Sequence, residues 1–236
     1  MPPVYKHLIQ CLFSEFIGTA FMMFAGCMGH WEAVQFTNTH FQISLNMALV
    51  VMIVVQCFGH ISGAHVNPAV TVAAFINDVI KFHMLMVYFI GQFFGAIAGF
   101  GLVVAVSSPM PDKFCLTLPN GNFTQFQVFA VEFIVTSMLV DVCCAVWDSR
   151  NVKNQDSLPV RLGLTVGCLT FSAINISGGS MNPVRSFGPA LLLLNFDYQW
   201  IYLAAPLSSS VISSLIYKYC FKSNPRTDFR MSIDSQ

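Results

Sequence analysis

Long apolar stretches dominate the chain, and short polar connections separate them. A bilayer's hydrocarbon core is about 30 Å thick, and a helix needs about 20 apolar residues to cross it. Runs near that length or longer lie close to residues 8–29, 41–58, 82–107, 126–148, 159–175 and 199–221. The pattern therefore predicts an all-α membrane protein with six transmembrane helices.

Two polar stretches interrupt this pattern, ISGAHVNPAV at 61–70 and ISGGSMNPVR at 176–185. The apolar segment that follows the first has about ten residues, and at 1.5 Å per residue it reaches about 15 Å, half the core. Proline suits the first position of a helix, and asparagine is a natural N-cap. We therefore expect two re-entrant half-helices, capped by Asn67 and Asn182. Each cap should leave its side-chain NH2 free to donate at the midplane, because irregular backbone is tolerated there only around a water-filled cavity.

The two interruptions belong to a repeat. Asn67 and Asn182 lie 115 residues apart, and SEFIGTAFMMFAGC (14–27) corresponds to VEFIVTSMLVDVCC (131–144), which aligns Glu15 with Glu132. Each half holds three spans, an odd number, so the second half must enter the membrane inverted. Inverted repeats with short, broken segments indicate a transport site near the midplane.

Charge is scarce and one-sided. Charged residues make up 9% of the chain, against about 25% in ordinary globular domains. The formal net charge of zero argues against a nucleic-acid partner. With six spans, Lys113 lies alone on one side, and the other side carries Lys6, Lys81, Arg150, Lys153, Arg161, Lys218, Lys222, Arg226 and Arg230. The excess of positive charge predicts that both termini are cytoplasmic, and the sequon at Asn122 then lies outside as a possible glycosylation site.

These boundaries predict three segments: a cytoplasmic N-terminus (1–7), a channel domain (8–221) and a cytoplasmic tail (222–236). The channel domain divides into a first repeat at about 8–107 and a second at about 126–221. Within the third span, Gly91, Gly95 and Gly99 form a double GxxxG pattern, which is typical of a close helix-packing face.

No chemistry of an enzyme is evident in the sequence. It has no nucleophile–base set, HExxH motif or phosphate loop, and His60 and His65 lack a third ligand for a metal. We expect no cofactor and no bound metal. The eight cysteines lie mostly in apolar runs without CxxC spacing, which favours buried, inert thiols over a disulfide framework.

The duplicated NP motifs, the paired Glu15 and Glu132, HISGAHVNPAV and GSMNPVRSFGPAL together resemble the aquaporin (major intrinsic protein) family over residues 8–221. The resemblance implies six tilted helices plus two half-helices, usually a homotetramer with one pore per subunit. The motif residues are Asn67, Pro68, Ala69, Asn182, Pro183 and Val184, where Val184 replaces the usual alanine. The pore-lining loops would be formed by Gly63, Ala64, His65, Gly178 and Ser180.

The two glutamates allow two interpretations. An acid within a membrane is a candidate proton relay. The symmetry of Glu15 and Glu132, and the family resemblance, favour instead a brace that accepts hydrogen bonds from each re-entrant loop.

Arg185 follows the second asparagine by three residues, and an unpaired arginine at that depth costs at least about 2.5 kcal/mol. A structural salt bridge is the alternative, but no acid lies nearby in the sequence. In the family the matching arginine guards the outer constriction, which Met47, Thr170 and Gly179 would complete here.

The identities of these filter residues bear on the substrate. Water-selective members usually have phenylalanine, histidine and a small residue at the three positions, so the filter here should be wider. It resembles the insect glycerol-conducting branch, although Ser186 and Ala190 match water channels. We therefore expect a plasma-membrane channel for water, glycerol and urea. The alternatives are a strictly water-selective channel, a junctional protein and an ion channel of the same fold.

Overall fold

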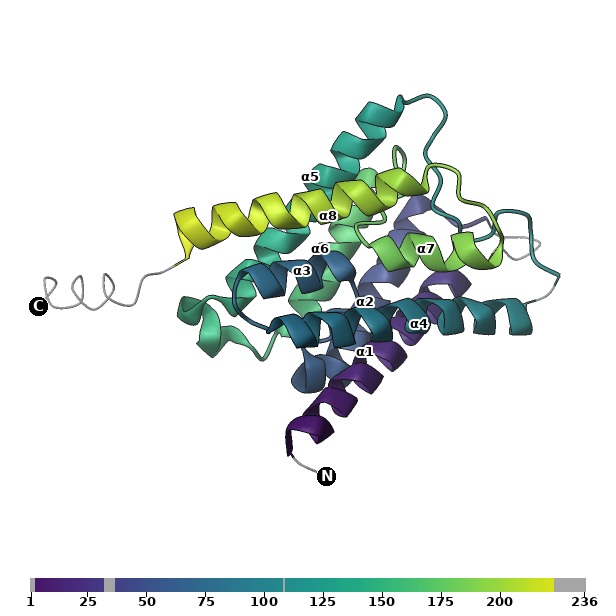
Figure 1. The fold of residues 1–236 in the computed structure, drawn as a ribbon. Helices are drawn as coiled ribbons and strands as arrows, with labels where there is room; N and C mark the ends of the chain where they lie inside the picture. The colour runs from purple at the N-terminus through teal and green to yellow at the C-terminus, as the bar shows by residue number, and fades with distance from the viewer. Residues whose placement is uncertain (1–2, 32–36, 108, 223–236) are drawn as a thin grey trace, which may run out of the picture.

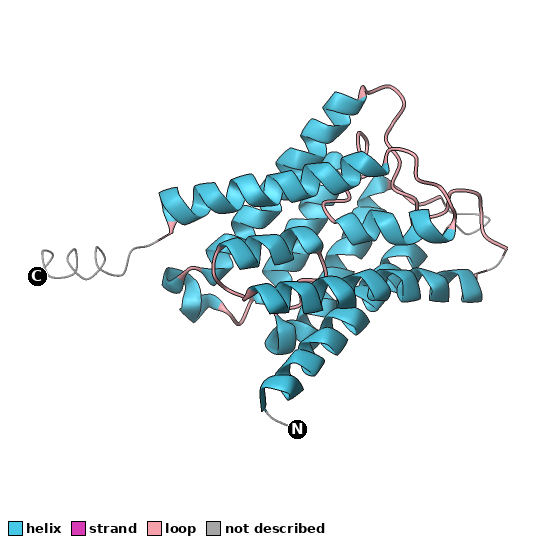
Figure 2. Cartoon of the chain, in the orientation of Figure 1, coloured by secondary structure: helices cyan, strands magenta, loops and turns pink. Residues whose placement is uncertain are grey.

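The computed structural model describes residues 3–31, 37–107 and 109–222, and all regular structure in them is helical (Figure 2). The α-helices are α1 (Pro3–Met28), α2 (His40–Ser62), α3 (Pro68–Ile76), α4 (Phe82–Val106), α5 (Gln125–Trp147), α6 (Leu158–Ala173), α7 (Pro183–Leu192) and α8 (Gln199–Ile216). A 3-10 helix, η1 (Ser149–Asn154), follows α5, and a π-helical turn, η2 (Tyr217–Phe221), extends α8. Of the predicted tail (222–236), only residue 222 is described. The tail arginines Arg226 and Arg230 therefore lie outside the described residues.

The predicted spans correspond to helices. Five helical stretches in the described residues, 23 to 25 residues long, are apolar and long enough to cross a membrane. The sixth predicted span, near 159–175, is α6, which has only 16 residues. The two segments after the asparagines are short helices of nine and ten residues, α3 and α7.

The helices pack as two related halves. In the first half α1 packs on α4, and in the second half α5 packs on α8, while α2 and α6 join the halves. Each half-helix packs chiefly against the last long helix of the other half, α3 on α8 and α7 on α4. Figure 1 shows α3 and α7 between α8 and α4, and the two half-helices touch each other. This exchange of half-helices is the arrangement that an inverted repeat predicts.

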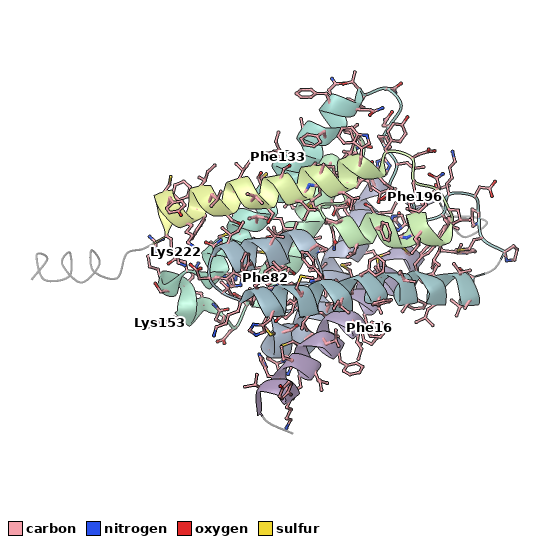
Figure 3. All side chains as sticks on the ribbon, in the orientation of Figure 1. Phe16, Phe82, Phe133, Lys153, Phe196 and Lys222 are labelled. Atoms are coloured by element: carbon pink, nitrogen blue, oxygen red, sulfur yellow. A yellow bond between two sulfur atoms is a disulfide. The ribbon has the colours of Figure 1, made fainter. Side chains whose placement is uncertain are left out.

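The bundle has two ends. One end, here called the terminal face, carries the start of α1 beside the end of α2, and η1 contacts η2 there. The loop face, at the opposite end, carries the end of α1 and residues 109–122. Figure 3 shows Lys153 and Lys222 at the terminal face. Near them, the Asp148 carboxylate pairs with the Arg150 guanidinium, which holds the pKa of Asp148 well below its usual range.

Large apolar side chains cover the outside of the bundle. Phe13, Phe94, Leu102 and Ile134 each expose more than half of their surface. A soluble monomer rarely exposes contiguous apolar surface on this scale, whereas a bilayer solvates it. The protein is therefore a multi-pass membrane protein.

The predicted glycine face on α4 packs directly against the backbone of α1. A Cβ added at Gly91 would lie 2.8 Å from the Leu12 carbonyl oxygen, and one at Gly95 would lie 2.9 Å from Thr19 Cβ. A Cβ at Gly99 would meet Ala20 Cα at 2.8 Å. The three glycines let the two helices approach more closely than any other residue would allow.

Gly95→Val should therefore push α1 away from α4. The added side chain must displace helix backbone, which typically costs about 1–3 kcal/mol. We expect a lower midpoint of thermal unfolding in detergent, measured by tryptophan fluorescence or by loss of the monodisperse peak. Gly101→Ala is the matched control on the same helix, since the nearest atom to its new Cβ is 3.9 Å away. Equal midpoints for the two variants would contradict the packing argument.

Candidate functional site

Each half-helix begins at a proline and is capped by the asparagine before it. Asn67 Oδ1 accepts a hydrogen bond from the Ala69 amide at 2.9 Å. Asn182 Oδ1 accepts from the amides of Val184 at 3.2 Å and Arg185 at 3.4 Å. These contacts satisfy amides that a helix start otherwise leaves without partners.

The amide groups of the two caps also tie the halves together. Asn67 Nδ2 donates to the Met181 carbonyl, and Asn182 Nδ2 donates to the Val66 carbonyl, each at 2.9 Å. Each NH2 group was expected to be free to donate at the midplane, and one hydrogen of each is used there by the opposite loop. An amide has two such hydrogens. The second hydrogen of each asparagine is on the side of the cavity that both residues line, and that of Asn182 has Met22 Sδ, a weak acceptor, at 3.8 Å.

The second re-entrant loop is held by one buried carboxylate. Glu132 is fully buried on α5. Its Oε1 accepts from the Ser177 hydroxyl at 2.7 Å and the Ser180 amide at 2.9 Å, and its Oε2 accepts from the Met181 amide at 2.8 Å. The carboxylate thus supplies the acceptors that this irregular backbone cannot find in a helix.

The first loop repeats the arrangement with Glu15 on α1. Its Oε1 accepts from the Ser62 hydroxyl at 2.6 Å and the His65 amide at 2.9 Å, and its Oε2 accepts from the Val66 amide at 2.8 Å. Gln92 adds a fourth donor, at 2.8 Å. Every one of these donors already uses its hydrogen on the carboxylate. This geometry suits a fixed brace.

The braced loops contain backbone that is costly for ordinary side chains. Ala64, Val66 and Met181 have positive φ values of 47°, 41° and 53°. Such conformations cost about 1–3 kcal/mol each and persist only where the surroundings enforce them. Two tyrosines add support, because Tyr88 donates to the Ser62 carbonyl and Tyr202 to the Ser177 carbonyl, each at 2.7 Å.

A cavity of about 290 Å³ lies in the centre of the bundle. At its terminal end lie Trp147, Gln155 and Leu158; further in, it passes both capping asparagines and reaches Arg185. Of the predicted loop residues, it is bordered by Gly63, Ala64, His65 and Ser180. Gly178 does not border it, since a Cβ at that position would instead lie 3.0 Å from Thr117 Cγ2.

Helical stripes form most of the wall, and of their members only Met47 was predicted from the sequence. Their members recur every four residues: Met47, Val51, Val55 and Gly59 on α2; Leu139, Cys143 and Trp147 on α5; and Leu158, Leu162 and Val166 on α6. The i, i+4 spacing was visible in the sequence, but a buried core face has the same spacing. Because the stripes are apolar, most of the polar groups that border the cavity belong to the loops and the capping asparagines.

Arg185 is buried, with 7% of its surface exposed. Its Nη1 donates to the Cys115 carbonyl at 3.0 Å and to the Thr117 hydroxyl at 2.8 Å. Among the described residues, no carboxylate lies within 4 Å of the guanidinium, so the salt-bridge alternative finds no support. A buried cation bound by neutral acceptors keeps its positive charge directed at the cavity that it borders.

The other predicted filter residues are differently placed. Met47 borders the cavity, whereas Thr170 and Gly179, both in the described part of the chain, do not. Thr170 extends the α6 stripe by one turn beyond Val166, towards the loop face. Its hydroxyl is buried and has no hydrogen-bond partner among the described residues. Gly179 has φ +64°, and a Cβ there would lie 3.1 Å from Thr170 Cα, so the glycine allows its loop to pack on the α6 backbone.

A histidine near the filter was also not predicted from the sequence. His30 follows the end of α1, and its Nδ1 lies 2.9 Å from the Gly26 carbonyl oxygen, to which it must donate. Burial and the nearby Arg185 charge lower the pKa of His30 to about 4. The imidazole is therefore neutral at physiological pH and adds no second cation beside Arg185.

The cysteines do not all behave as buried thiols, and that expectation was wrong for several of them. Cys27 and Cys115 form a disulfide, because the fold brings the end of α1 against residues 109–122. Cys57, Cys168 and Cys220 are exposed, while Cys143 borders the cavity. The sequon residue Asn122 is exposed on the loop face.

Replacing the brace should weaken the fold. Glu132→Gln puts an NH2 group where one oxygen accepts, so at least one buried loop donor loses its partner, at a cost of about 1–3 kcal/mol. We expect a lower midpoint of thermal unfolding, and a similar loss for Glu15→Gln. Asp141→Asn is the matched control, because Asp141 is an exposed acid on the same helix as Glu132. If Glu132→Gln and Asp141→Asn have the same midpoint of thermal unfolding, the carboxylate is not a brace.

Comparison with known proteins agrees with this geometry. The model of the family described as "Major intrinsic protein" matches residues 4–217. Aquaporin-4 of Mus musculus is 39% identical over 180 residues, which cover 76% of this chain and 56% of that protein. Aquaporin-2 of Bos taurus is 32% identical, covering 89% of this chain and 78% of that protein. The chain thus spans little more than half the length of its aquaporin-4 relatives.

A solved structure has the same fold. The aquaglyceroporin from Plasmodium falciparum superposes with a TM-score of 0.83 at 24% identity, covering 94% of this chain and 99% of that one. The likeness confirms the predicted fold class, with half-helices set into an inverted repeat. Together with the family match, it shows that this chain belongs to the major intrinsic protein family, the aquaporins.

Proposed function

We propose that this protein is a passive, bidirectional channel for water and small uncharged solutes, with glycerol and urea among them. The observation that carries the proposal is the central cavity, which passes both capping asparagines and ends at a buried arginine. Solute would cross in single file within the domain at 8–221. Such a path needs no cofactor and no chemical step, so the protein acts as a channel and not as an enzyme.

Exclusion of ions follows from the two helix starts. The N-terminus of a helix carries about half a positive charge, and α3 and α7 both begin at the cavity. The second amide hydrogen of Asn67 and of Asn182 donates to the oxygen of a passing water. That water cannot then donate onward through the asparagines, which interrupts a proton wire. Arg185 repels cations at the outer end.

The substrate class rests on the filter. Met47 gives an apolar wall, and Thr170, whose buried hydroxyl has no hydrogen-bond partner among the described residues, would give a hydrogen-bonding wall if that hydroxyl turned towards a solute. Glycerol has one carbon edge and one hydroxyl edge, so it fits between an apolar wall and a hydrogen-bonding wall. The likeness to the structure of an aquaglyceroporin is in keeping with this choice. The 39% identical relatives are named aquaporins, so strict selectivity for water is the alternative.

We also propose a topology and an assembly. The scarcity of Lys and Arg on the loop face supports placing it outside the cell, with both termini in the cytoplasm. The Cys27–Cys115 disulfide, which lies on that face, fits an oxidising compartment. The plasma membrane is the proposed location, and a homotetramer the proposed assembly.

Thr170→His tests the substrate class. An imidazole at this position would narrow the filter and leave room for water but not for a three-carbon chain. A glycerol that loses two hydrogen bonds without replacement would cross at least about 30-fold more slowly. We expect glycerol uptake to be abolished while most of the osmotic water flux remains. The measurement is paired swelling and uptake in proteoliposomes at matched protein content.

Ser172→His is the control, because this residue is exposed on the same helix, two positions away. It should leave both fluxes at the wild-type level. Wild-type protein that passes water but no glycerol would establish the water-selective alternative. A Thr170→His variant that still passes glycerol would show that the constriction lies elsewhere.

A further inference from the structure

The strap, defined as residues 113–120, folds over the start of α7 on the loop face. Among the described residues, both oxygen atoms that accept from the Arg185 side chain belong to it, the Cys115 carbonyl and the Thr117 hydroxyl. Thr117 also accepts from the Ser186 hydroxyl at 2.9 Å. The position of the strap therefore determines where the filter guanidinium can lie.

The strap is fixed at two points. At one, the Cys27–Cys115 disulfide joins it to the end of α1, with 5.4 Å between the Cα atoms. At the other, the Asn120 amide and side chain donate to the Ile176 and Asn175 carbonyls, each at 3.0 Å. The first anchor attaches the strap to the first repeat and the second attaches it to the second repeat.

The disulfide anchor is the one nearest the guanidinium. The Cys115 residue forms the disulfide with its side chain and accepts from Arg185 with its carbonyl oxygen. Its φ of +58° is one that residues other than glycine rarely adopt, so this backbone needs support from outside. Helix α1 supplies it, because the glycine face of α4 holds α1 in close contact.

We propose that the Cys27–Cys115 disulfide positions the selectivity filter: through the Cys115 carbonyl it clamps the Arg185 guanidinium against the wall and keeps the opening clear. This inference rests on the proposed channel function. When the disulfide is broken, the carbonyl moves and the guanidinium loses an acceptor. A buried cation that has lost an acceptor turns towards water, and the water is in the lumen. A freed Arg185 obstructs a large solute more than a small one.

The test compares glycerol and water permeability of the purified full-length protein in proteoliposomes, before and after reduction with tris(2-carboxyethyl)phosphine. The S–S bond becomes two thiols, and the phosphine becomes its oxide with water supplying the oxygen and both protons. We expect the glycerol-to-water permeability ratio to fall about fivefold, the effect of losing one hydrogen bond. Alkylation followed by mass spectrometry should find two additional modified cysteines after reduction.

Variants separate this role from general damage. Cys27→Ser/Cys115→Ser should reproduce the low ratio without reductant, and Cys168→Ser, an exposed cysteine on α6, should not. In an Arg185→Val background, reduction should leave the ratio unchanged, because the guanidinium that the disulfide acts through is gone. If the double serine variant does not fold, reduction of the wild type still decides the question.

Two failures are distinguishable. Wild-type protein that does not conduct glycerol overturns the proposed function and, with it, this role. A conducting wild type in which alkylation finds no disulfide, or whose ratio is unchanged or higher after complete reduction, overturns the role of the disulfide alone.

Discussion

Two buried carboxylates make the rest of this structure possible. A chain that enters a bilayer and turns back leaves amides without helical partners, and in hydrocarbon each such group costs several kcal/mol. Glu15 and Glu132 meet this constraint, since each accepts from two consecutive loop amides and from a serine hydroxyl. Because the carboxylates sit on long helices that pack elsewhere, the position of each loop is set by the bundle and not by the loop's own sequence.

The functional groups take their places from these two braces. The braced loops end at Asn67 and Asn182, whose amides each bond to a carbonyl of the opposite loop. That exchange brings the starts of α3 and α7 together, so two positive helix ends share one cavity. Arg185, in the first turn of α7, then reaches the strap residues Cys115 and Thr117, which complete its environment.

A large part of the fold and of the candidate site could be predicted from the sequence, because membrane spans, helix caps and repeats are local or periodic signals. The half-helices, their capping asparagines and the α4 glycine face follow from such signals. The disulfide of Cys27 could not be predicted, since it joins residues 88 positions apart through tertiary packing. The mutual bonds of the asparagines depend on how the halves meet, and Gly179 proved to pack against α6, which its small size alone did not indicate.

Amide hydrogen exchange at His65, Val66, Ser180 and Met181 tests the central claim most directly. These four amides lie outside any helix, beside a cavity large enough for water, so unbraced they would exchange quickly. If Glu15 and Glu132 hold them, they should exchange as slowly as amides inside the buried part of α3, such as that of Ala73. Exchange as rapid as that of the exposed loop around Asn122 would contradict the account.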